Sequence, residues 1–395
     1  MNTETETSVR LFASTQSWIE GEAVRQLYAT AKFDGMRQAV GFPDLHPGKG
    51  SPVGAAFVTE EVIYPHLIGG DIGCGMALFR TDLVRRDAKL DRWAKLPFNL
   101  EHPWDASVGD FLAARDLVST EFDAALGTIG GGNHFAELQT VEKVLDAAEF
   151  AKLGLGKQQL VLLVHSGSRG LGEVTLRNHV DRFYATGVAV ETFAAEEYLR
   201  GHDYAVRWAQ ANRELIAQRF AAKIGADVER LWDGCHNSIT LRERRHPAGG
   251  SEWNGFGNSP AGCQRSRVWL HRKGAVDATA DFVVIPGSRG TLSYLVKPTG
   301  DGASHAWSLA HGAGRKWTRS EARQRMRERF SVAELAQTGL GSRVVCEERD
   351  LLYEEAPGAY KKIEDVIADL VAAGLVSVIA TLRPLLTYKT RKTRR

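Results

Sequence analysis

Short apolar runs and longer amphipathic stretches alternate along this chain. Residues 161–164 and 282–285 are unbroken runs of valine, leucine, isoleucine and phenylalanine, and residues 78–81 continue a third apolar segment. Short runs of this kind, bounded by glycine or polar residues, predict buried strands. We therefore expect strands at these three places.

Other segments repeat their apolar residues with the period of a helix. Within residues 203–223, for example, Ala205, Trp208, Ala209 and Ile216 fall on one face. The predicted helices cover residues 20–31, 180–184 with their flanks, 203–223, and 360–373, the last ended by Gly374. The mixture predicts an α/β fold. Without a fixed repeat or a clear linker, 395 residues fit one large domain or two closely packed ones.

The 40 glycines gather in short blocks rather than in a linker. Glycine accepts positive φ and lets the backbone approach a ligand closely. Because each block lies beside an apolar run or a histidine, we expect these loops to converge on one site. The blocks are residues 41–54, 69–75, 127–132, 167–172, 287–290 and 312–314.

Composition narrows the class of protein. Apolar residues make up 43% of the chain and charged residues 25%, which is the balance of a folded protein. The net charge of +2 argues against a general polyanion-binding protein, although residues 242–245 and 389–395 are locally basic. No secretory leader or apolar stretch of about 18 residues is visible. Four irregularly spaced cysteines suit a reducing compartment, so we expect a cytoplasmic protein.

Five potential metal ligands stand beside glycines or at the ends of predicted strands. Asp71 and Cys74 lie three residues apart in a glycine-rich loop, and His134, His165 and His236 add imidazoles. Alone, a cysteine is more typically a small buried hydrophobe and a histidine a hydrogen-bonded core residue. Together they predict a metal site. Ligand softness by itself favours zinc, and five ligands would suffice for two ions.

A second set of residues has the composition of a phosphate-handling loop. His311 is followed by Gly312, Gly314 and a basic pair at residues 315–316. His311 could be a nucleophile toward a phosphoryl group, with the glycine amides and basic side chains neutralising charge. Asp44 could orient the imidazole by accepting its other N–H. The alternative interpretation is a capping loop at the start of a helix.

Taken together, these blocks resemble the RtcB family of RNA ligases from about Trp18 to Lys389. The number of motifs found in order makes coincidence negligible. The segments that carry the resemblance are residues 42–50 (FPDLHPGKG), 71–76 (DIGCGM), 131–137 (GGNHFAE), 165–170 (HSGSRG), 236–237 (HN), 271–275 (HRKGA), 286–288 (PGS) and 311–315 (HGAGR). Residues 18–23 (WIEGEA) are similar to the branch of the family found alongside a peptide-release-factor homologue.

The resemblance implies one large mixed α/β domain over residues 1–389, followed by a basic tail at residues 390–395. Central sheets flanked by helices would enclose a deep metal-binding cleft lined by glycine-rich loops. The implied activity is GTP- and Mn²⁺-dependent ligation of an RNA 3′-phosphate or 2′,3′-cyclic phosphate to a 5′-hydroxyl, in RNA repair or tRNA splicing. Implied partners are that RNA, GTP, and an activating protein or release-factor homologue, with no membrane.

The family's functional residues carry over motif by motif. His311 would become guanylylated, with Asp44 orienting it. Two Mn²⁺ ions would be held by Asp71, Cys74, His134, His165 and His236. Nucleotide and phosphate contacts would come from Asn133, Glu137, Arg169, Asn237, Ser288, Gly312, Gly314 and Lys389. Glu137 and Ser288 would contact the guanine. The chain departs from the family by continuing six residues beyond Lys389 and by its unmatched loop at residues 242–253.

Two other functions stay open on the sequence. A metal-dependent phosphoesterase acting on RNA ends would use the same ligands to activate water, but it would not need His311 as a nucleotidyl acceptor. An RNA-binding accessory protein with a relic site is the second alternative, and the complete set of expected ligands argues against it.

Overall fold

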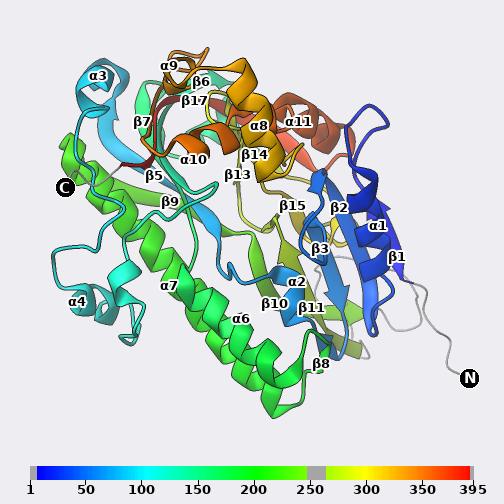
Figure 1. The fold of residues 1–395 in the computed structure, drawn as a ribbon. Coiled ribbons are helices and arrows are strands. Elements are labelled where there is room, and N and C mark those ends of the chain that lie inside the picture. The colour runs from blue at the N-terminus through cyan, green and yellow to red at the C-terminus, as the bar shows by residue number, and fades with distance from the viewer. Residues whose placement is uncertain (1–6, 247–263, 392–395) are drawn as a thin grey trace, which may run out of the picture.

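The computed structural model describes residues 7–246 and 264–391, which fold into two large β-sheets and two short strand pairs, with helices on the outer surfaces (Figure 1). Residues 247–253 of the unmatched loop and residues 392–395 of the expected basic tail lie outside the described residues. Thr390, the first residue of that expected tail, is the last residue of a strand.

The smaller sheet has five strands, in which β1 pairs parallel to β2 and the remaining pairs are antiparallel. Its order is β1 (Ser8–Leu11), β2 (Met36–His46), β3 (Val53–Thr59), β11 (Gln264–Lys273) and β10 (Asn237–His246).

The larger sheet is antiparallel apart from one parallel edge pair, β16 with β17. Its order is β13 (Val283–Pro286), β14 (Ser293–Pro298), β17 (Val376–Thr390), β6 (Phe135–Val144), β7 (Gln159–Ser166), β5 (Gly75–Val84) and β9 (Val228–Cys235), with β16 (Arg343–Cys346) off this path. The sheet curls so that its two ends approach each other, with the rings of Trp232 and Phe282 at 6.4 Å between centroids. Two short pairs complete the strands: β12 (Ala275–Asp277) with β15 (Ser308–Ala310), and β4 (Val62–Ile63) with β8 (Val188–Ala189).

Helices cover the outer faces, and the two longest, α6 and α7, lie side by side (Figure 1). Helix α7 begins with Thr192, whose side chain caps the amide of Ala195, and ends at Gly225 in the left-handed conformation. The helices are α1 (Gly21–Thr30), α2 (Pro65–Ile68), α3 (Leu90–Trp93), α4 (Val108–Ala113), α5 (Ala147–Lys152), α6 (Gly170–Phe183), α7 (Phe193–Ile224), α8 (Arg319–Arg329), α9 (Val332–Ala336), α10 (Arg349–Glu354) and α11 (Ile363–Ala372).

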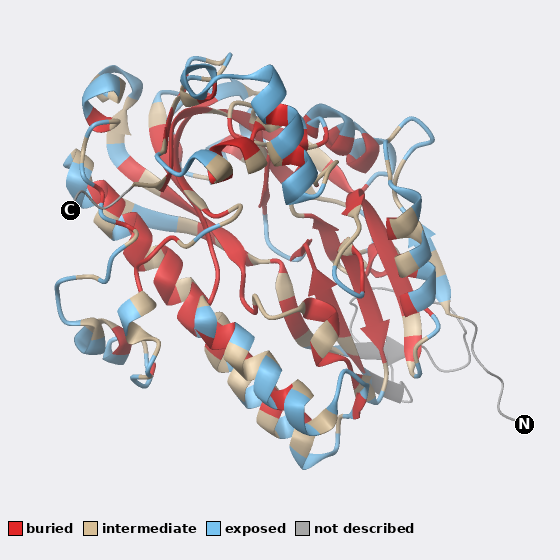
Figure 2. Ribbon diagram, viewed as in Figure 1, coloured by how far each residue is buried: buried red, intermediate tan, exposed pale blue. Residues whose placement is uncertain are grey.

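Strand β7 explains why its sequence is an unbroken apolar run. Successive side chains of a strand point to opposite faces. Val161 and Leu163 enter the core shared with the smaller sheet, whereas Leu162 and Val164 enter a second core that includes Phe220 of α7. Both faces of β7 are therefore buried, and Figure 2 shows the buried residues concentrated in these central strands.

The predicted elements are present in the structure. The expected strands lie within β5, β7 and β13, although Phe282 itself precedes β13. The expected helices correspond to α1, α6, α7 and α11, with α11 starting at Ile363 rather than Tyr360. The four residues predicted to share one face of α7 are all fully buried. Within the described ranges, none of the helices combines the length and apolar character needed to cross a membrane.

Trp208 tests how far the fold depends on α7. Its side chain is fully buried between α7 and its neighbours, so Trp208→Ala should lower the free energy of unfolding by about 3–5 kcal/mol. Phe193→Ala is the control on the same helix, because Phe193 is 67% exposed and its loss should change that free energy by at most about 0.5 kcal/mol. Urea unfolding followed by circular dichroism measures both. Equal effects of the two substitutions would contradict the packing described here.

Candidate metal centre

The ends of four strands bring the predicted ligands together. Cys74 and His134 immediately precede β5 and β6, His165 lies near the end of β7, and His236 immediately follows β9. Because β5 is antiparallel to both β7 and β9, and β6 is antiparallel to β7, these starts and ends meet at one edge of the sheet.

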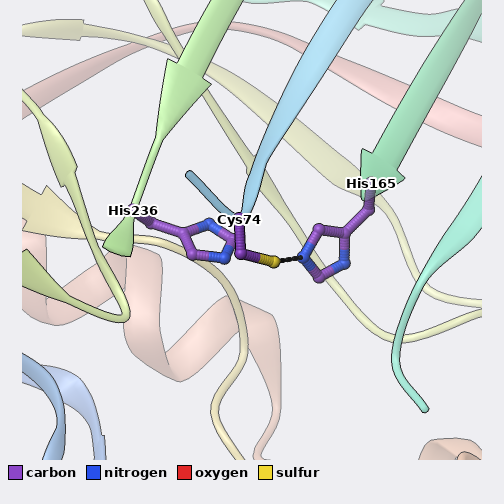
Figure 3. Close-up of side chains that lie close together, drawn as sticks. All are labelled: Cys74, His165 and His236. Atoms are coloured by element: carbon purple, nitrogen blue, oxygen red, sulfur yellow. Dashed lines mark hydrogen bonds between the residues drawn. The ribbon is translucent and has the colours of Figure 1, made fainter. Parts of the chain in front are cut away.

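Side-chain distances show that the ligands converge. The sulfur of Cys74 lies 3.4 Å from Nε2 of His134 and 3.3 Å from Nε2 of His165. An oxygen of Asp71 is 3.4 Å from Nε2 of His134. Figure 3 shows the Cys74 thiol between the rings of His165 and His236.

The ligand atoms form two overlapping groups. In one, atoms of Cys74, His165 and His236 all lie within 4.8 Å of one another; in the other, so do atoms of Asp71, Cys74 and His134. A set of one thiolate, three imidazoles and one carboxylate has the chemistry of a divalent transition-metal site. The residues present therefore fit a divalent-cation site, and Cys74 belongs to both groups of potential ligands.

Hydrogen bonds outside the ligand set orient two of the imidazoles. Nδ1 of His134 lies 3.0 Å from the carbonyl oxygen of Ile129, and Nδ1 of His165 lies 3.2 Å from that of Asn133. A carbonyl can only accept, so each Nδ1 carries the hydrogen and each Nε2 keeps its lone pair for a ligand.

Burial sets the protonation of the centre. It lowers the pKa of His165 and His236 far below the ordinary histidine value, and the neighbouring histidines add to this effect. Burial also raises the pKa of the Cys74 thiol well above its ordinary value, and the nearby Asp71 carboxylate raises it further. At neutral pH the imidazoles are therefore ready to bind a cation, whereas the thiol must first lose its proton.

His311 lies beside this centre and is held by Asp44. Nδ1 of His311 is 2.7 Å from Oδ2 of Asp44, and the same oxygen accepts from the His311 amide at 3.1 Å. The rings of His311 and His236 are 4.7 Å apart between centroids. Since Asp44 engages Nδ1, the Nε2 lone pair of His311 is the one available for chemistry, as the sequence predicts for an oriented nucleophile.

Glycine is required where the His311 loop meets β2. Gly314 has φ of +70°, and a Cβ there would lie 2.3 Å from the backbone oxygen of Asp44. On the other side of Asp44, a Cβ on Gly54 would lie 2.8 Å from Oδ1 of that carboxylate. At the metal centre, a Cβ on Gly167 would lie 2.2 Å from Oδ1 of Asp71. These approaches account for the predicted convergence of glycine blocks.

A cavity of about 210 Å³ opens beside His311. Its lining contains His165 of the metal centre and most of the residues expected to contact nucleotide or phosphate: Asn133, Glu137, Ser288, Gly312, Gly314 and Lys389. The structure therefore brings these segments, distant in sequence, into one cleft.

Glu137 and Lys389 form part of one wall of this cavity. The Glu137 oxygens accept from Nε2 of Gln139 at 2.7 Å and from the hydroxyl of Thr387 at 2.5 Å, and burial raises the pKa of this carboxyl. The ammonium of Lys389 donates to the carbonyl of His134 at 2.9 Å, and burial lowers its pKa to about 8. An acceptor and a donor thus stand close together in the same wall.

Two of the expected phosphate contacts lie next to Asp71 instead of in the cavity lining. Nδ2 of Asn237 donates to the Asp71 carbonyl at 3.2 Å, and its Oδ1 accepts from the amide of Gly274 at 3.0 Å. Arg169 has φ of +57°, a conformation that costs a residue with a side chain roughly 1–3 kcal/mol. A Cβ on Gly130 would overlap its guanidinium, so that glycine leaves room for Arg169 beside the centre.

Arg315 lines the cavity, and its guanidinium is also bonded to neighbouring segments of the protein. Its guanidinium donates to Glu355 at 3.1 Å and to the carbonyls of Glu354 at 2.9 Å and Trp317 at 3.1 Å. These bonds tie the segment after His311 to α10. The expectation that Arg315 neutralises a phosphate stays a prediction.

Two polar residues next to the centre were missed by sequence analysis: Asn212 and Arg213, both fully buried on α7. The sequence does indicate that Asn212 is buried, because Asn212 falls on the same helical face as Trp208, Ala209 and Ile216. A polar side chain on a buried apolar face needs hydrogen-bond partners inside the protein.

Comparison with known proteins gives one consistent result. The sequence model of the family described as "tRNA-splicing ligase RtcB" matches residues 26–124 and 110–390. The chain is 42% identical to "RNA-splicing ligase RtcB2" of Escherichia coli strain ATCC 25922 over 382 residues, covering 97% of this chain and 96% of that protein. It is 30% identical to "RNA-splicing ligase RtcB" of Escherichia coli K12, covering 94% and 95%. It is 28% identical to "tRNA-splicing ligase RtcB" of Archaeoglobus fulgidus, covering 93% and 91%.

Gly314→Ala should disturb the contact between His311 and Asp44. Gly225→Ala is the matched control, since Gly225 has φ of +73° but no atom within 4 Å of an added Cβ. The control should lose only the left-handed penalty of about 1–2 kcal/mol of unfolding free energy. Gly314→Ala should lose more, and its NMR spectrum should lack the downfield resonance of the His311 Nδ1 proton. Retention of that resonance would refute the close-approach argument.

Divalent-metal affinity should rise with pH. Because burial keeps Cys74 protonated and keeps His165 and His236 neutral near pH 7, the thiol must release one proton on binding, and log K should increase by about one per pH unit between about pH 7 and about 8.5. Calorimetry in buffers of different ionisation enthalpy counts that proton. Cys74→Ser should bind more weakly and with a flatter slope. A pH-independent affinity in the unmodified protein would be inconsistent with thiolate ligation.

Proposed function

The chain belongs to the RtcB family of RNA ligases, and we propose that it joins an RNA 3′-phosphate or 2′,3′-cyclic phosphate to a 5′-hydroxyl, with GTP as co-substrate. The observation that carries this proposal is the pair formed by His311 and Asp44 beside a cluster of five metal-ligand side chains. We also propose that residues 1–389 act as one ligase domain.

His311 would act as the nucleophile in the first step. Its Nε2 would form a bond to the α-phosphorus of GTP as the bond from that phosphorus to the bridging oxygen breaks and pyrophosphate leaves. Asp44 would hold the ring in the reactive tautomer and stabilise the positive charge that the ring acquires. An oxygen of the RNA 3′-phosphate would then displace His311 and take over the GMP. Attack by the RNA 5′-hydroxyl would finally release GMP and close the RNA backbone.

Asp71, Cys74, His134, His165 and His236 would hold two Mn²⁺ ions. When bound, such ions neutralise charge on the attacking and leaving oxygens of in-line displacements at phosphorus and activate the water that opens a cyclic phosphate. Manganese is proposed from the family resemblance, because the thiolate and imidazole donors by themselves suit zinc as well.

The proposed nucleotide specificity rests on the cavity wall. Guanine presents N1–H and an exocyclic amine as donors, and the buried carboxylate of Glu137 could accept from both. Adenine has an unprotonated N1 that would face this carboxylate as a second acceptor, leaving buried polar atoms unpaired. Ser288 and Lys389 would add contacts to the same base from the same cavity.

Phosphate groups would lie between the base and the metal centre. Asn133 and the amides of Gly312 and Gly314 line the cavity beside His311 and would donate to phosphate oxygens. Arg169 and Asn237, next to Asp71, would contact the RNA 3′-phosphate, where a guanidinium fork matches phosphate geometry.

A phosphoesterase with the same metals is the main alternative. The His311 and Asp44 pair argues against it, because water activated by a metal needs no second, oriented nucleophile. The accessory-protein alternative is disfavoured by the convergence of the whole ligand set, since a relic site has no reason to keep a thiol and three imidazoles buried together in the interior.

Intact-mass measurement after incubation with Mn²⁺ and GTP tests the first step. The unmodified protein should gain one acid-labile GMP, and His311→Ala should gain none. Asp44→Asn should form the adduct about 100-fold more slowly, because the imidazole is no longer held in position.

His102→Ala removes an exposed histidine that does not line the cavity, so this variant should form the adduct at the normal rate. An adduct of unchanged yield in His311→Ala would exclude this residue as the nucleophile. Absence of any adduct from the metal-loaded unmodified protein would favour the phosphoesterase.

A further inference from the structure

Helix α7 carries two consecutive charged or polar residues, Asn212 and Arg213, that are completely buried. Neither belongs to the ligand set, and neither lines the cavity beside His311. Burying these groups costs free energy unless every donor and acceptor finds a partner, so their partners indicate what they do.

Asn212 joins two of the loops that lead to metal ligands. Its Oδ1 accepts from the amide of Gly127 at 2.7 Å. Its Nδ2 lies 3.3 Å from the carbonyl of Thr128, 3.1 Å from the hydroxyl of Ser166 and 3.1 Å from the carbonyl of Gly167. One side-chain amide thus connects the loop before His134 to the loop after His165.

Arg213 joins two further segments. Its Nε and Nη2 donate to the two oxygens of Asp233 at 2.8 and 2.6 Å, and Asp233 lies three residues before His236. Its Nη1 donates to the carbonyl of Gly73 at 2.8 Å and to that of Ser166 at 2.9 Å. Gly73 stands between Asp71 and Cys74, and Ser166 directly follows His165.

The contacts reach the ligands through very few bonds. The hydroxyl of Ser166 donates to the carbonyl of Ile129 at 2.9 Å, and this is the carbonyl that orients the imidazole of His134. The amide of His236 bonds to the carbonyl of Cys74 at 2.8 Å. Asp71, Cys74, His165 and His236 therefore each lie within three residues of a group that Asn212 or Arg213 holds. His134 is reached through the Ile129 carbonyl, which Ser166 also contacts.

We propose that Asn212 and Arg213 are positioning residues that set the spacing of the ligands at the metal centre, so that one rigid helix places all four ligand-bearing segments. This inference rests on the proposed function, because it requires that the centre bind divalent cations. Side chains held this way on a regular helix can fix ligands more accurately than the glycine-rich loops could by themselves.

Two conservative substitutions separate positioning from packing. Asn212→Asp keeps the shape but replaces Nδ2 with an oxygen that faces the Thr128 carbonyl, the Ser166 hydroxyl and the Gly167 carbonyl. Arg213→Lys keeps the charge, but one ammonium cannot reproduce the fork that serves Asp233 and two carbonyls. Two controls lie on the same helix. Arg207→Lys alters an arginine that donates to the carbonyls of Arg115 and Asp116. Trp208→Phe perturbs the core without removing a hydrogen bond to a ligand-bearing loop, because the indole nitrogen of Trp208 has no hydrogen-bond partner among the described residues.

The experiment measures Mn²⁺ affinity by calorimetry and the absorption spectrum of the Co²⁺-loaded protein, in which thiolate charge-transfer and d–d bands report the geometry around Cys74. Circular dichroism checks that each variant is folded. Asn212→Asp and Arg213→Lys should bind Mn²⁺ about 10- to 100-fold more weakly and shift the Co²⁺ bands. Arg207→Lys and Trp208→Phe should leave both measurements unchanged.

Three results would overturn the inference. Unaltered affinity and bands in the folded Asn212→Asp and Arg213→Lys proteins would remove the positioning role while leaving the metal centre intact. The same weakening in Trp208→Phe would show that general loss of stability is responsible. Absence of Mn²⁺ and Co²⁺ binding by the unmodified protein would refute the metal centre itself, and the positioning role with it.

Discussion

The antiparallel pairing of β5 with β7 and β9 is the constraint on which the rest of the site depends. Antiparallel neighbours place the start of one strand beside the end of the next. Cys74 therefore lies beside His165 and His236, although His165 is 91 positions away in the sequence and His236 is farther still. The pairing of β6 with β7 adds His134 at the same edge. A shift of register in any of these pairs would separate the donors.

The position of this edge inside the molecule determines its chemistry. Burial keeps the imidazoles of His165 and His236 uncharged and keeps the Cys74 thiol protonated. The cluster offers strong metal-binding donors, but none of its own ligand atoms carries a positive charge that could stabilise a Cys74 thiolate. A metal ion would supply that charge, so its binding would release the thiol proton. Asp44 is also fully buried, yet it has the His311 ring and amide as partners. The dry surroundings strengthen that contact and hold the ring in one orientation.

The ligand side chains are positioned by elements that do not themselves carry ligands. The ligands stand in loops whose glycines permit close approach, as where Gly167 faces Asp71 and Gly314 faces Asp44. The same freedom would leave such loops loosely defined. Helix α7 supplies the missing rigidity through Asn212 and Arg213, and the loop after His311 is tied to α10 through Arg315. The centre thus combines permissive loops with a regular scaffold.

The sequence by itself determined the family of the protein, the residue types of the candidate site and part of the fold. The apolar run of β7 predicts a buried strand because both of its faces are covered, and the helical stripe of α7 is visible because its buried residues recur with the helical period. Strand β17 is less readable, since Pro384 and two irregularities in its pairing with β6 interrupt the alternation. The ligand types, His311 and Asp44 stand in recognisable motifs, which is why the family could be identified. Only the tertiary structure decided that Cys74 is shared by two ligand groups, that Arg315 is bonded to α10, and that Asn212 and Arg213 hold the loops. These facts depend on contacts between segments far apart in the chain, and local patterns carry no information about such distances.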